Sequence, residues 1–250
     1  TVKFARVDEA GPPLGVGGIS TDISKIRRLE GESKRAWNET LRRIATAVEL
    51  RDEETGGHVE RMSAYAALIA SHLGLSAERV TDIGVAAQLH DAGKIGIPDE
   101  ILLKPGSFTA EERRIMQTHA TIGYELLAGT GSELLDLAAT IAWTHHERVD
   151  GSGYPRQLRG DEIPIEGRIA AVADVFDALT SNRIYRPAMP LDDALAILRD
   201  GRGRAFDPIV LDALLDNLDE AVAISLRHAD PAQIIGRSAR WPRSARSDQA

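Results

Sequence analysis

The chain contains no cysteine and no long apolar run. Without cysteine it can form neither a disulfide nor a thiolate metal site. This composition fits a reducing compartment, and we expect a cytoplasmic location. No window approaches the roughly 18 uninterrupted apolar residues of a membrane span. The first residues, Thr1 to Phe4, have neither an initiator methionine nor a signal-peptide pattern, so we expect the sequence to be a piece of a longer polypeptide.

An excess of basic residues is also missing. The 250 residues include 30 Lys and Arg against 38 Asp and Glu, which gives a formal net charge of −8. Because nucleic-acid polymers are held by basic surfaces, this balance argues against a general nucleic-acid binder. Any phosphate-bearing substrate must then be met by bound metals and a few Lys or Arg side chains. With 43% hydrophobic and 27% charged residues, the composition otherwise indicates one main globular domain with appendages.

The residue pattern divides the chain into four regions. Residues 1–21 end in Val16-Gly17-Gly18-Ile19-Ser20-Thr21, which resembles the closing strand and exit of a PAS sensory domain; the alternative is an unstructured chain end. Residues 22–50 favour a helix, and residues 45–226 show the pattern of the main domain. Residues 227–250 are basic with little apolar periodicity, so we predict a disordered tail, with a docking segment as the alternative.

The predicted helix over residues 22–50 carries an apolar stripe. Trp37, Leu41, Ile44 and Val48 follow one another at spacings of four, three and four residues, as in a coiled coil. Two interpretations are open. The helix is either a signalling linker that pairs with a second copy in a homodimer, or a helix packed on its own domain.

The main domain shows almost only helical periodicity, so we predict an all-α fold. Five of the seven histidines lie at inward-facing positions of the predicted helices: His58, His90, His119, His145 and His146. A hydrogen-bonded core imidazole would explain any one of them. Five together are hard to explain by packing, because buried polar side chains cost stability unless they are satisfied.

Two carboxylates extend the candidate set. Asp91 directly follows His90, and we expect Gly93 to end the helix that carries them. On a later predicted helix, Asp174 and Asp177 share a side with small residues only, so this side can approach another structure closely. We expect Asp174 to be a metal ligand and Asp177 to support it or a neighbouring histidine. Imidazoles and carboxylates bind borderline transition metals, and paired metals cleave phosphoesters, so the sequence predicts a metal-dependent phosphodiesterase.

Two further stretches suit a phosphate-bearing substrate. After the double histidine, Gly151 and Gly153 permit unusual backbone angles and close approach to a ligand, and Tyr154 offers a ring for stacking and a hydroxyl. Arg183 and Arg186 lie three residues apart, and guanidinium groups match phosphate oxygens. The alternatives are a surface turn for the first stretch and a solvated helix end for the second.

Several stretches, in order along the chain, resemble one known family. They are Arg51–His58 (RDEETGGH), His90–Asp99 (HDAGKIGIPD), Leu103–Gly106 (LKPG), His119, His145–Glu147 (HHE), Asp150–Pro155 (DGSGYP), Ala173–Ser181 (ADVFDALTS) and Phe206–Pro208 (FDP). These stretches are similar to the motifs of the HD-GYP family of bacterial cyclic di-GMP phosphodiesterases, over roughly residues 45–210. Ala92 departs from the pattern, since a larger aliphatic residue is usual there; we expect looser packing and unchanged ligation.

The resemblance implies an all-α HD-domain helical bundle around a multinuclear site for two or three divalent metal ions, with iron or manganese as the main candidates. By position, one ion would be held by His58, His90, Asp91 and Asp174, and a second by His119, His145 and His146, with Asp91 bridging. Glu54 stands where family members with a third metal use a glutamate; the alternative is an exposed residue in a first helical turn.

The implied activity is hydrolysis of cyclic di-GMP to linear pGpG, and further to GMP where the reaction continues, in the output domain of a signalling protein with an upstream sensor. Asp91 and Lys94 would be the catalytic residues, with Lys94 stabilising charge at the attacked phosphate. Arg183 and Arg186 would hold phosphates, and Tyr154 would contact a base or the backbone. The mixed cyclic GMP-AMP dinucleotide is an alternative substrate. Another HD-superfamily nucleotide hydrolase and a non-catalytic dinucleotide-binding module are alternative functions.

Overall fold

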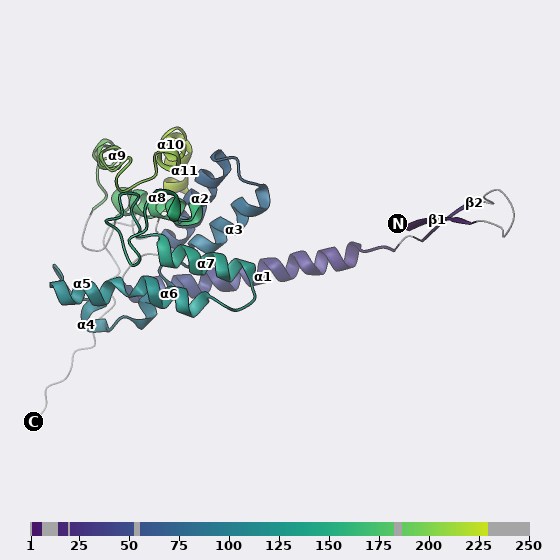
Figure 1. Ribbon diagram of the computed structural model, residues 1–250, viewed down its shortest axis with the longest axis horizontal. Helices are drawn as coiled ribbons and strands as arrows, with labels where there is room; N and C mark the ends of the chain where they lie inside the picture. Colours follow the sequence, from purple (N-terminus) through teal and green to yellow (C-terminus); the bar gives the residue numbers. More distant parts are fainter. Residues whose placement is uncertain (1, 7–14, 20, 53–55, 183–186, 230–250) are drawn as a thin grey trace, which may run out of the picture. The chain divides into compact units, whose positions relative to one another are not determined.

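The chain folds into two units, Thr1–Thr40 and Leu41–Ala250. The computed structural model describes residues 2–6, 15–19, 21–52, 56–182 and 187–229. The first unit contains a hairpin of the antiparallel strands β1 (Val2–Arg6) and β2 (Gly15–Ile19), as Figure 1 shows. The strand expected before residue 21 is therefore present, while its assignment to a PAS-like domain stays a prediction.

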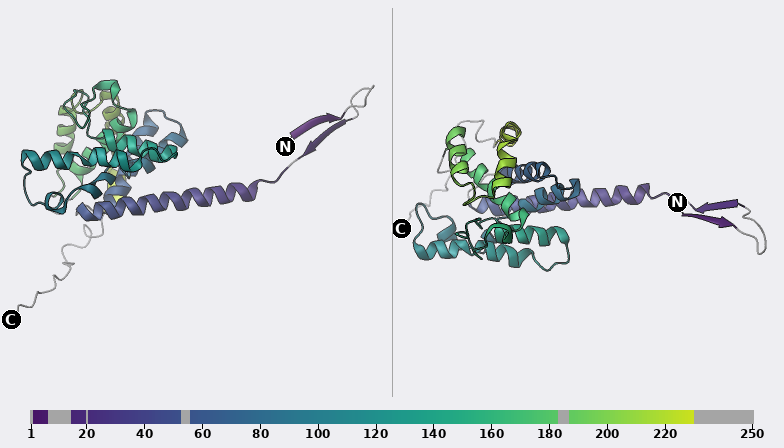
Figure 2. Two further views of the ribbon diagram at one scale, coloured as in Figure 1. Left: turned by 60° about the horizontal axis from the view of Figure 1, so that its bottom comes forward. Right: turned by 45° about the horizontal axis from the view of Figure 1, so that its top comes forward.

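Helix α1 (Ser24–Glu49) covers most of the predicted linker and is drawn in purple as one continuous helix in Figure 2. Its last part belongs to the second unit, where Leu41, Ala45 and Val48 are buried in the core. Ile44, at the edge of the same stripe, is 50% exposed. The predicted apolar stripe is thus divided, because Leu41 and Val48 pack on their own domain. Pairing with a second copy stays a prediction.

The second unit is a bundle of helices. These are α2 (Gly56–His72), α3 (Ala77–Ala87), α4 (Asp99–Leu102), α5 (Ala110–Gln117), α6 (His119–Leu127), α7 (Glu133–Thr144), α8 (Ile165–Thr180), α9 (Leu191–Asp200), α10 (Pro208–Leu215) and α11 (Leu218–Arg227). Short 3-10 turns are η1 (Leu50–Asp52), η2 (Ala92–Gly96) and η3 (Gly160–Glu162). The predicted all-α class is confirmed for the described part of this unit. None of the described helices is long and apolar enough to cross a membrane.

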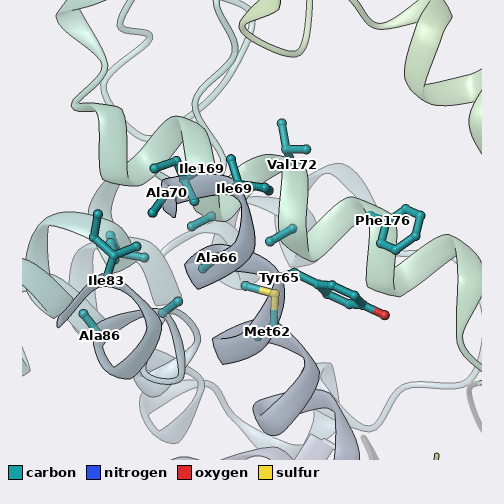
Figure 3. Packing of buried hydrophobic residues seen from close by; sticks show 14 of the residues in the cluster. Met62, Tyr65, Ala66, Ile69, Ala70, Ile83, Ala86, Ile169, Val172 and Phe176 are labelled. Atoms are coloured by element: carbon teal, nitrogen blue, oxygen red, sulfur yellow. The ribbon is translucent and has the colours of Figure 1, made fainter. Parts of the chain in front are cut away.

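The core lies where α2 packs against α3 and α8, and where α7 packs against α3, α6 and α8. Ile69 of α2 and Ile83 of α3 are fully buried there, and the ring of Tyr65 meets that of Phe176 edge to face at 5.1 Å between centroids (Figure 3). Burial of large apolar side chains stabilises this arrangement by about 1.5–3 kcal/mol each. It also fixes α2 and α8 relative to each other, and these two helices carry His58 and Asp177.

The expectation that Gly93 ends the helix carrying His90 is wrong. Helix α3 ends at Ala87, and the chain then turns tightly, so His90 lies beyond the helix. Gly93 falls in η2, which packs closely against α6. A Cβ atom on Gly93 would collide with the backbone of His119 and Gly123. The glycine is therefore required by a tertiary contact between two segments and not by a helix terminus.

Candidate metal centre

Helix ends and turns bring the five candidate histidines together. His58 lies in the first turns of α2, His90 in the turn after α3, His119 at the start of α6, and His145 and His146 at the end of α7. Their rings form a continuous chain. The centroid distances are 5.4 Å for His58 and His90, 5.1 Å for His90 and His145, 3.9 Å for His145 and His146, and 4.9 Å for His146 and His119.

Asp91 lies at the middle of this chain of rings. Its Oδ1 atom is 3.2 Å from His119 Nε2 and 3.5 Å from His145 Nε2. Its Oδ2 atom is 3.4 Å from His90 Nε2. One carboxylate therefore faces imidazoles on both sides, which is the arrangement that a bridging ligand requires. The bridging role itself stays a prediction.

The potential ligand atoms of the described residues form two groups. In each group the atoms lie within 4.8 Å of one another; one is Asp91, His119, His145 and His146, and the other is Glu49, His58 and His90. The first group matches the expected second-ion set together with its bridging carboxylate. The second contains Glu49, which the sequence reasoning missed. Asp174 is half-buried on α8 and belongs to neither group, so its role as a ligand stays a prediction.

Backbone carbonyls fix the orientation of three imidazoles. The Nδ1 atom of each donates to the carbonyl oxygen three residues earlier, at 2.9 Å for His90, 2.7 Å for His119 and 3.1 Å for His145. A carbonyl oxygen can only accept, so Nδ1 carries a proton, and Nε2 offers its lone pair whenever the ring is neutral. Metal-ligating histidines are oriented by such contacts.

The Nε2 atoms of these three rings and Oδ1 of Asp91 are buried and have no hydrogen-bond partner among the described residues. Leaving a buried polar atom unsatisfied costs about 1–3 kcal/mol. Four such atoms that converge on one place would be satisfied together by a cation. Imidazole nitrogen and carboxylate oxygen are ligands of divalent transition metals, so the donor set fits a divalent metal site.

Asp177 orients His58. Its carboxylate accepts from His58 Nδ1 at 2.8 Å, from Arg61 Nε at 2.6 Å and from the hydroxyl of Ser181 at 3.0 Å. Burial alone would raise the pKa of Asp177, but the contacts with His58 and Arg61 bring this pKa down to about 2. The carboxylate is therefore ionised at neutral pH and holds the proton of His58 on Nδ1. The expectation that Asp177 supports a neighbouring histidine is confirmed.

The two sides of the centre differ in their affinity for protons. Burial lowers the pKa of His119 to about 4 and that of His146 well below its ordinary value. Burial also lowers the pKa of His90, but the charges of Asp91 and Asp174 outweigh it and raise this pKa to about 9. For Asp91, burial raises the pKa, yet Lys94 and His90 together hold it well below the usual range. Neutral His119 and His146 thus face an ionised Asp91.

Lys94 is buried beside Asp91. Its Nζ atom is 2.7 Å from Asp91 Oδ2 and forms a second ion pair with Asp52 of η1. The sequence motif that contains Asp52 indicates no role for this residue by itself. The structure shows that it shares the Lys94 ammonium with Asp91 and so fixes the direction of the lysine side chain.

Arg51 fastens η1 to η2. Its Nη1 atom donates to the carbonyls of Lys94 at 2.8 Å and Ile95 at 2.9 Å, and its Nη2 atom donates to the carbonyl of Ile97 and to Asp99 Oδ1, both at 2.7 Å. The guanidinium group thus holds the turn that carries Lys94. Its role was also missed, because nothing in the sequence indicates which carbonyls an arginine will reach.

The Tyr154 ring stacks on the ring of His146, with 4.6 Å between centroids and an interplanar angle of 29°. Burial, followed by the charges of Asp91 and Asp174, raises the pKa of the Tyr154 hydroxyl, so the hydroxyl stays protonated. The resemblance implied that this tyrosine contacts the substrate, and the structure puts its ring against a candidate metal ligand.

The loop that carries Tyr154 is held by Glu147, which is buried and accepts from the backbone amides of Arg156 at 2.7 Å and Leu158 at 3.0 Å. Gly153 packs against the chain itself, since a Cβ atom there would collide with the backbone of Arg148 and Glu147. The expected close approach of this glycine is therefore to the backbone of its own loop. Gly151 has a φ of +79°, which agrees with the unusual backbone angle expected of it.

Replacing Glu147 with alanine should loosen this loop. Two part-buried hydrogen bonds from backbone amides to the Glu147 carboxylate are lost, so we expect the free energy of unfolding to fall by about 2–4 kcal/mol. Urea denaturation measures the change. Glu133→Ala is the matched control, because Glu133 is exposed in the first turn of α7 and its loss should change stability by less than about 0.5 kcal/mol. Equal stability of the two variants would contradict the role of Glu147.

Three candidates, Glu54, Arg183 and Arg186, lie outside the described residues. Their roles stay predictions. His72 and His228, which are the remaining histidines, lie away from the described ligand groups; His72 Nδ1 contacts the carbonyl of Leu68 and His228 Nδ1 contacts Glu60.

Comparison with known proteins agrees with this geometry. RpfG, a cyclic di-GMP phosphodiesterase response regulator of Xanthomonas campestris, is 56% identical over 177 residues, which make up 71% of this chain and 47% of that protein. The 3′3′-cGAMP-specific phosphodiesterase 2 of Vibrio cholerae is 45% identical over 186 residues, or 74% of this chain and 36% of that protein. The chain thus spans about half or less of the length of these curated relatives.

Among solved structures, a cyclic GMP-AMP specific phosphodiesterase of V. cholerae (V-cGAP3) has a TM-score of 0.57 at 20% identity and covers 78% of this chain and 54% of its own. This likeness shows a shared fold. The HD domain model matches residues 42–210, a span that contains every histidine of the metal centre. The chain therefore belongs to the HD domain family, and its resemblance to HD-GYP proteins is confirmed.

Proposed function

We propose that this chain is a metal-dependent phosphodiesterase that hydrolyses cyclic di-GMP to linear pGpG, and on to GMP where the reaction continues. The observation that carries the proposal is the convergence of buried imidazole Nε2 atoms on the Asp91 carboxylate. Paired divalent ions in such a site suit phosphoester cleavage. The cyclic dinucleotide substrate is supported by the name of the relative at 56% identity.

The proposed cofactors are two or three divalent transition metal ions, with iron or manganese as the first candidates. His119, His145 and His146 would hold one ion, and His58, His90 and Asp174 another, with Asp91 between them and Glu54 available to a third. When bound, the ions would neutralise phosphate charge and supply a nucleophile at neutral pH. Imidazole and carboxylate ligands accept several metals, and availability decides among them.

The protein's own groups would orient the substrate and stabilise developing charge. The Lys94 ammonium is fixed between Asp52 and Asp91 at the edge of the centre, where it can donate to a phosphate oxygen as negative charge grows. The Tyr154 ring covers His146, and its protonated hydroxyl can donate to the substrate. Arg183 and Arg186 would hold the phosphates through guanidinium hydrogen bonds.

Replacing Lys94 with methionine should reduce turnover by about 10²–10³-fold and leave the metal content intact. The change removes the ammonium and keeps the length of the side chain. Elemental analysis of the loaded protein and the rate of dinucleotide cleavage measure the two effects. Lys104→Met is the control, because Lys104 pairs with Glu112 at 2.6 Å, outside the candidate ligand groups. Loss of metal from the Lys94 variant would instead show that Lys94 supports the site structurally.

A product assay tests the proposed activity. The protein is purified anaerobically, loaded with Fe²⁺ or Mn²⁺, and given cyclic di-GMP, mixed cyclic GMP-AMP or a nucleoside triphosphate, and the products are separated by chromatography. Metal-dependent formation of pGpG or GMP supports the proposal and identifies the substrate. If protein with at least two bound ions cleaves neither cyclic dinucleotide, the proposal fails; triphosphate cleavage would then favour another nucleotide hydrolase, and no cleavage a binding module.

The remaining regions fit a signalling protein. We place the end of a PAS-like sensor in residues 1–21, a signalling linker in 22–50, the catalytic domain in 45–226 and a basic tail in 227–250, most of which lies outside the described residues. A homodimer through the linker and a cytoplasmic location complete the proposal. Analytical ultracentrifugation at several protein concentrations tests the dimer, and a monomer at every concentration would contradict it.

A further inference from the structure

Helix α1 ends in a buried glutamate. Glu49 exposes only 1% of its surface, whereas the next residue, Leu50, is 64% exposed. The buried end of α1 therefore includes Val48 and Glu49 and stops at Leu50. Fully buried glutamates are rare unless their charge is compensated, so the surroundings of Glu49 must favour a carboxylate.

Those surroundings include two of the candidate metal ligands. A carboxylate oxygen of Glu49 and ring nitrogens of His58 and His90 all lie within 4.8 Å of one another. The three side chains come from separate segments, namely the end of α1, the start of α2 and the turn after α3. Three elements that only the tertiary fold brings together therefore supply the potential ligands of one site. Their spacing suits a metal ion with bonds of about 2.1 Å.

The tautomers of the two histidines decide what faces the glutamate. His58 Nδ1 contacts the Asp177 carboxylate at 2.8 Å, and His90 Nδ1 contacts a backbone carbonyl at 2.9 Å. Each acceptor holds a proton on Nδ1, so when a metal ion displaces any proton from Nε2, that atom is available as a ligand. The Nε2 atom of His90 is buried without a hydrogen-bond partner among the described residues. A cation bound among these three donors would compensate the charge of the buried carboxylate.

We propose that Glu49 is a ligand of the metal ion bound by His58 and His90. The proposal rests on the metal centre of the proposed function and adds to it a ligand from α1. Because an ion bound there joins the end of α1 to α2 and to the turn carrying Asp91, metal occupancy and the docking of the α1 end are linked, and the linkage acts in both directions.

Metal binding by Glu49→Gln tests the role of the carboxylate. The glutamine keeps the size of the side chain and removes its charge. We expect the full chain with this change to lose one ion or to bind Mn²⁺ at least about tenfold more weakly, as measured by elemental analysis and by titration of free Mn²⁺ with electron paramagnetic resonance. Glu166→Gln is the matched control, since Glu166 is buried but pairs with Arg79, and it should bind as the unchanged protein does.

A second measurement needs no variant. In the unchanged protein, added Mn²⁺ should slow amide hydrogen exchange in residues 45–50, at the end of α1. Protection that appears with Mn²⁺ supports the linkage, and identical exchange with and without bound Mn²⁺ overturns it. This readout keeps the inference testable if the Glu49 variant does not fold.

The outcomes separate this inference from the proposed function. If the unchanged protein binds ions and Glu49→Gln binds them with the same number and affinity, Glu49 is not a ligand, and the proposed phosphodiesterase stands. If the unchanged protein binds no divalent ion, the metal centre fails and the proposed function fails with it.

Discussion

Replacing Asp91 with alanine is expected to abolish both metal binding and turnover. The carboxylate faces His90 through Oδ2, at 3.4 Å, and faces His119 and His145 through Oδ1, at 3.2 and 3.5 Å. No other described carboxylate belongs to the same ligand group as His119 and His145. Removal of a partner that only orients a ligand already costs 10–100-fold in metal affinity, so loss of Asp91 should cost more than about 100-fold.

The measurement is the metal content of the Asp91 variant after loading, together with its rate of dinucleotide cleavage. The alanine also removes one of the carboxylate partners of the buried Lys94. Asp91→Asn, which keeps the size of the side chain, should therefore be measured as well. Asp212→Ala is the control, because Asp212 forms a partly exposed pair with Arg202 that contributes little. Near-normal activity with full metal content in the Asp91 variants would disprove the bridging role.

Replacing Gly93 with alanine is expected to separate η2 from α6 and to disorganise the centre. The added Cβ atom would meet the backbone of His119 and Gly123, and neither can move away without shifting α6. Since His119 is the first residue of that helix, its imidazole would be displaced from Asp91. Overpacking of this kind destabilises by about 3 kcal/mol, and we expect metal loss together with the drop in stability.

Thermal or urea denaturation and metal analysis measure the effect of the Gly93 change. Gly31→Ala is the matched control, because a Cβ atom on Gly31 would meet nothing within 4 Å and the position lies inside α1. Alanine favours a helix over glycine by about 1 kcal/mol, so this control should be unchanged or slightly more stable. If the free energy of unfolding of the Gly93 variant is within about 0.5 kcal/mol of that of the unchanged protein, α6 can shift to accommodate the added Cβ atom at little cost.

Several contacts with the candidate metal centre come from the end of α1 and the turn η1. Arg51 holds the backbone of η2, Asp52 holds the Lys94 ammonium, and Glu49 lies with His58 and His90. These three residues are close neighbours in the sequence, yet each reaches a different part of the site. Displacement of this short segment would therefore alter metal ligation and the position of Lys94 at once.

The histidines and Asp91 could be predicted because their signal is local. Helical periodicity places His58 on the inward face of α2, and the adjacent Asp91 is visible in the sequence itself. The other histidines lie at helix ends or in turns, so their grouping was predicted correctly although the helices expected to carry them differ. The same local logic suggested that Asp177 would support a histidine, and the structure shows its contact with His58 at 2.8 Å. The all-α class was predictable for the same reason.

Local sequence signals gave a wrong or incomplete prediction where the same residue pattern is compatible with two structures. The stripe through Leu41, Ile44 and Val48 suits both a coiled coil and a core-facing helix, and the structure buries Leu41 and Val48 while Ile44 stays half exposed. Gly93 could be a helix terminus or a point of close packing, and α3 in fact ends at Ala87. The neighbour that each residue meets decides between the alternatives, and that neighbour is distant in the sequence.

The sequence by itself determined the all-α class and the set of histidines that turn inward, because both depend on residue spacings of a few positions along the chain. Only the tertiary structure decided that Arg51 reaches the carbonyl of Lys94, 43 residues away, and that Glu49 joins His58 and His90. A long side chain can reach any segment that packing brings near it. Its partner therefore depends on how the helices pack together, and no periodicity in the sequence records that arrangement.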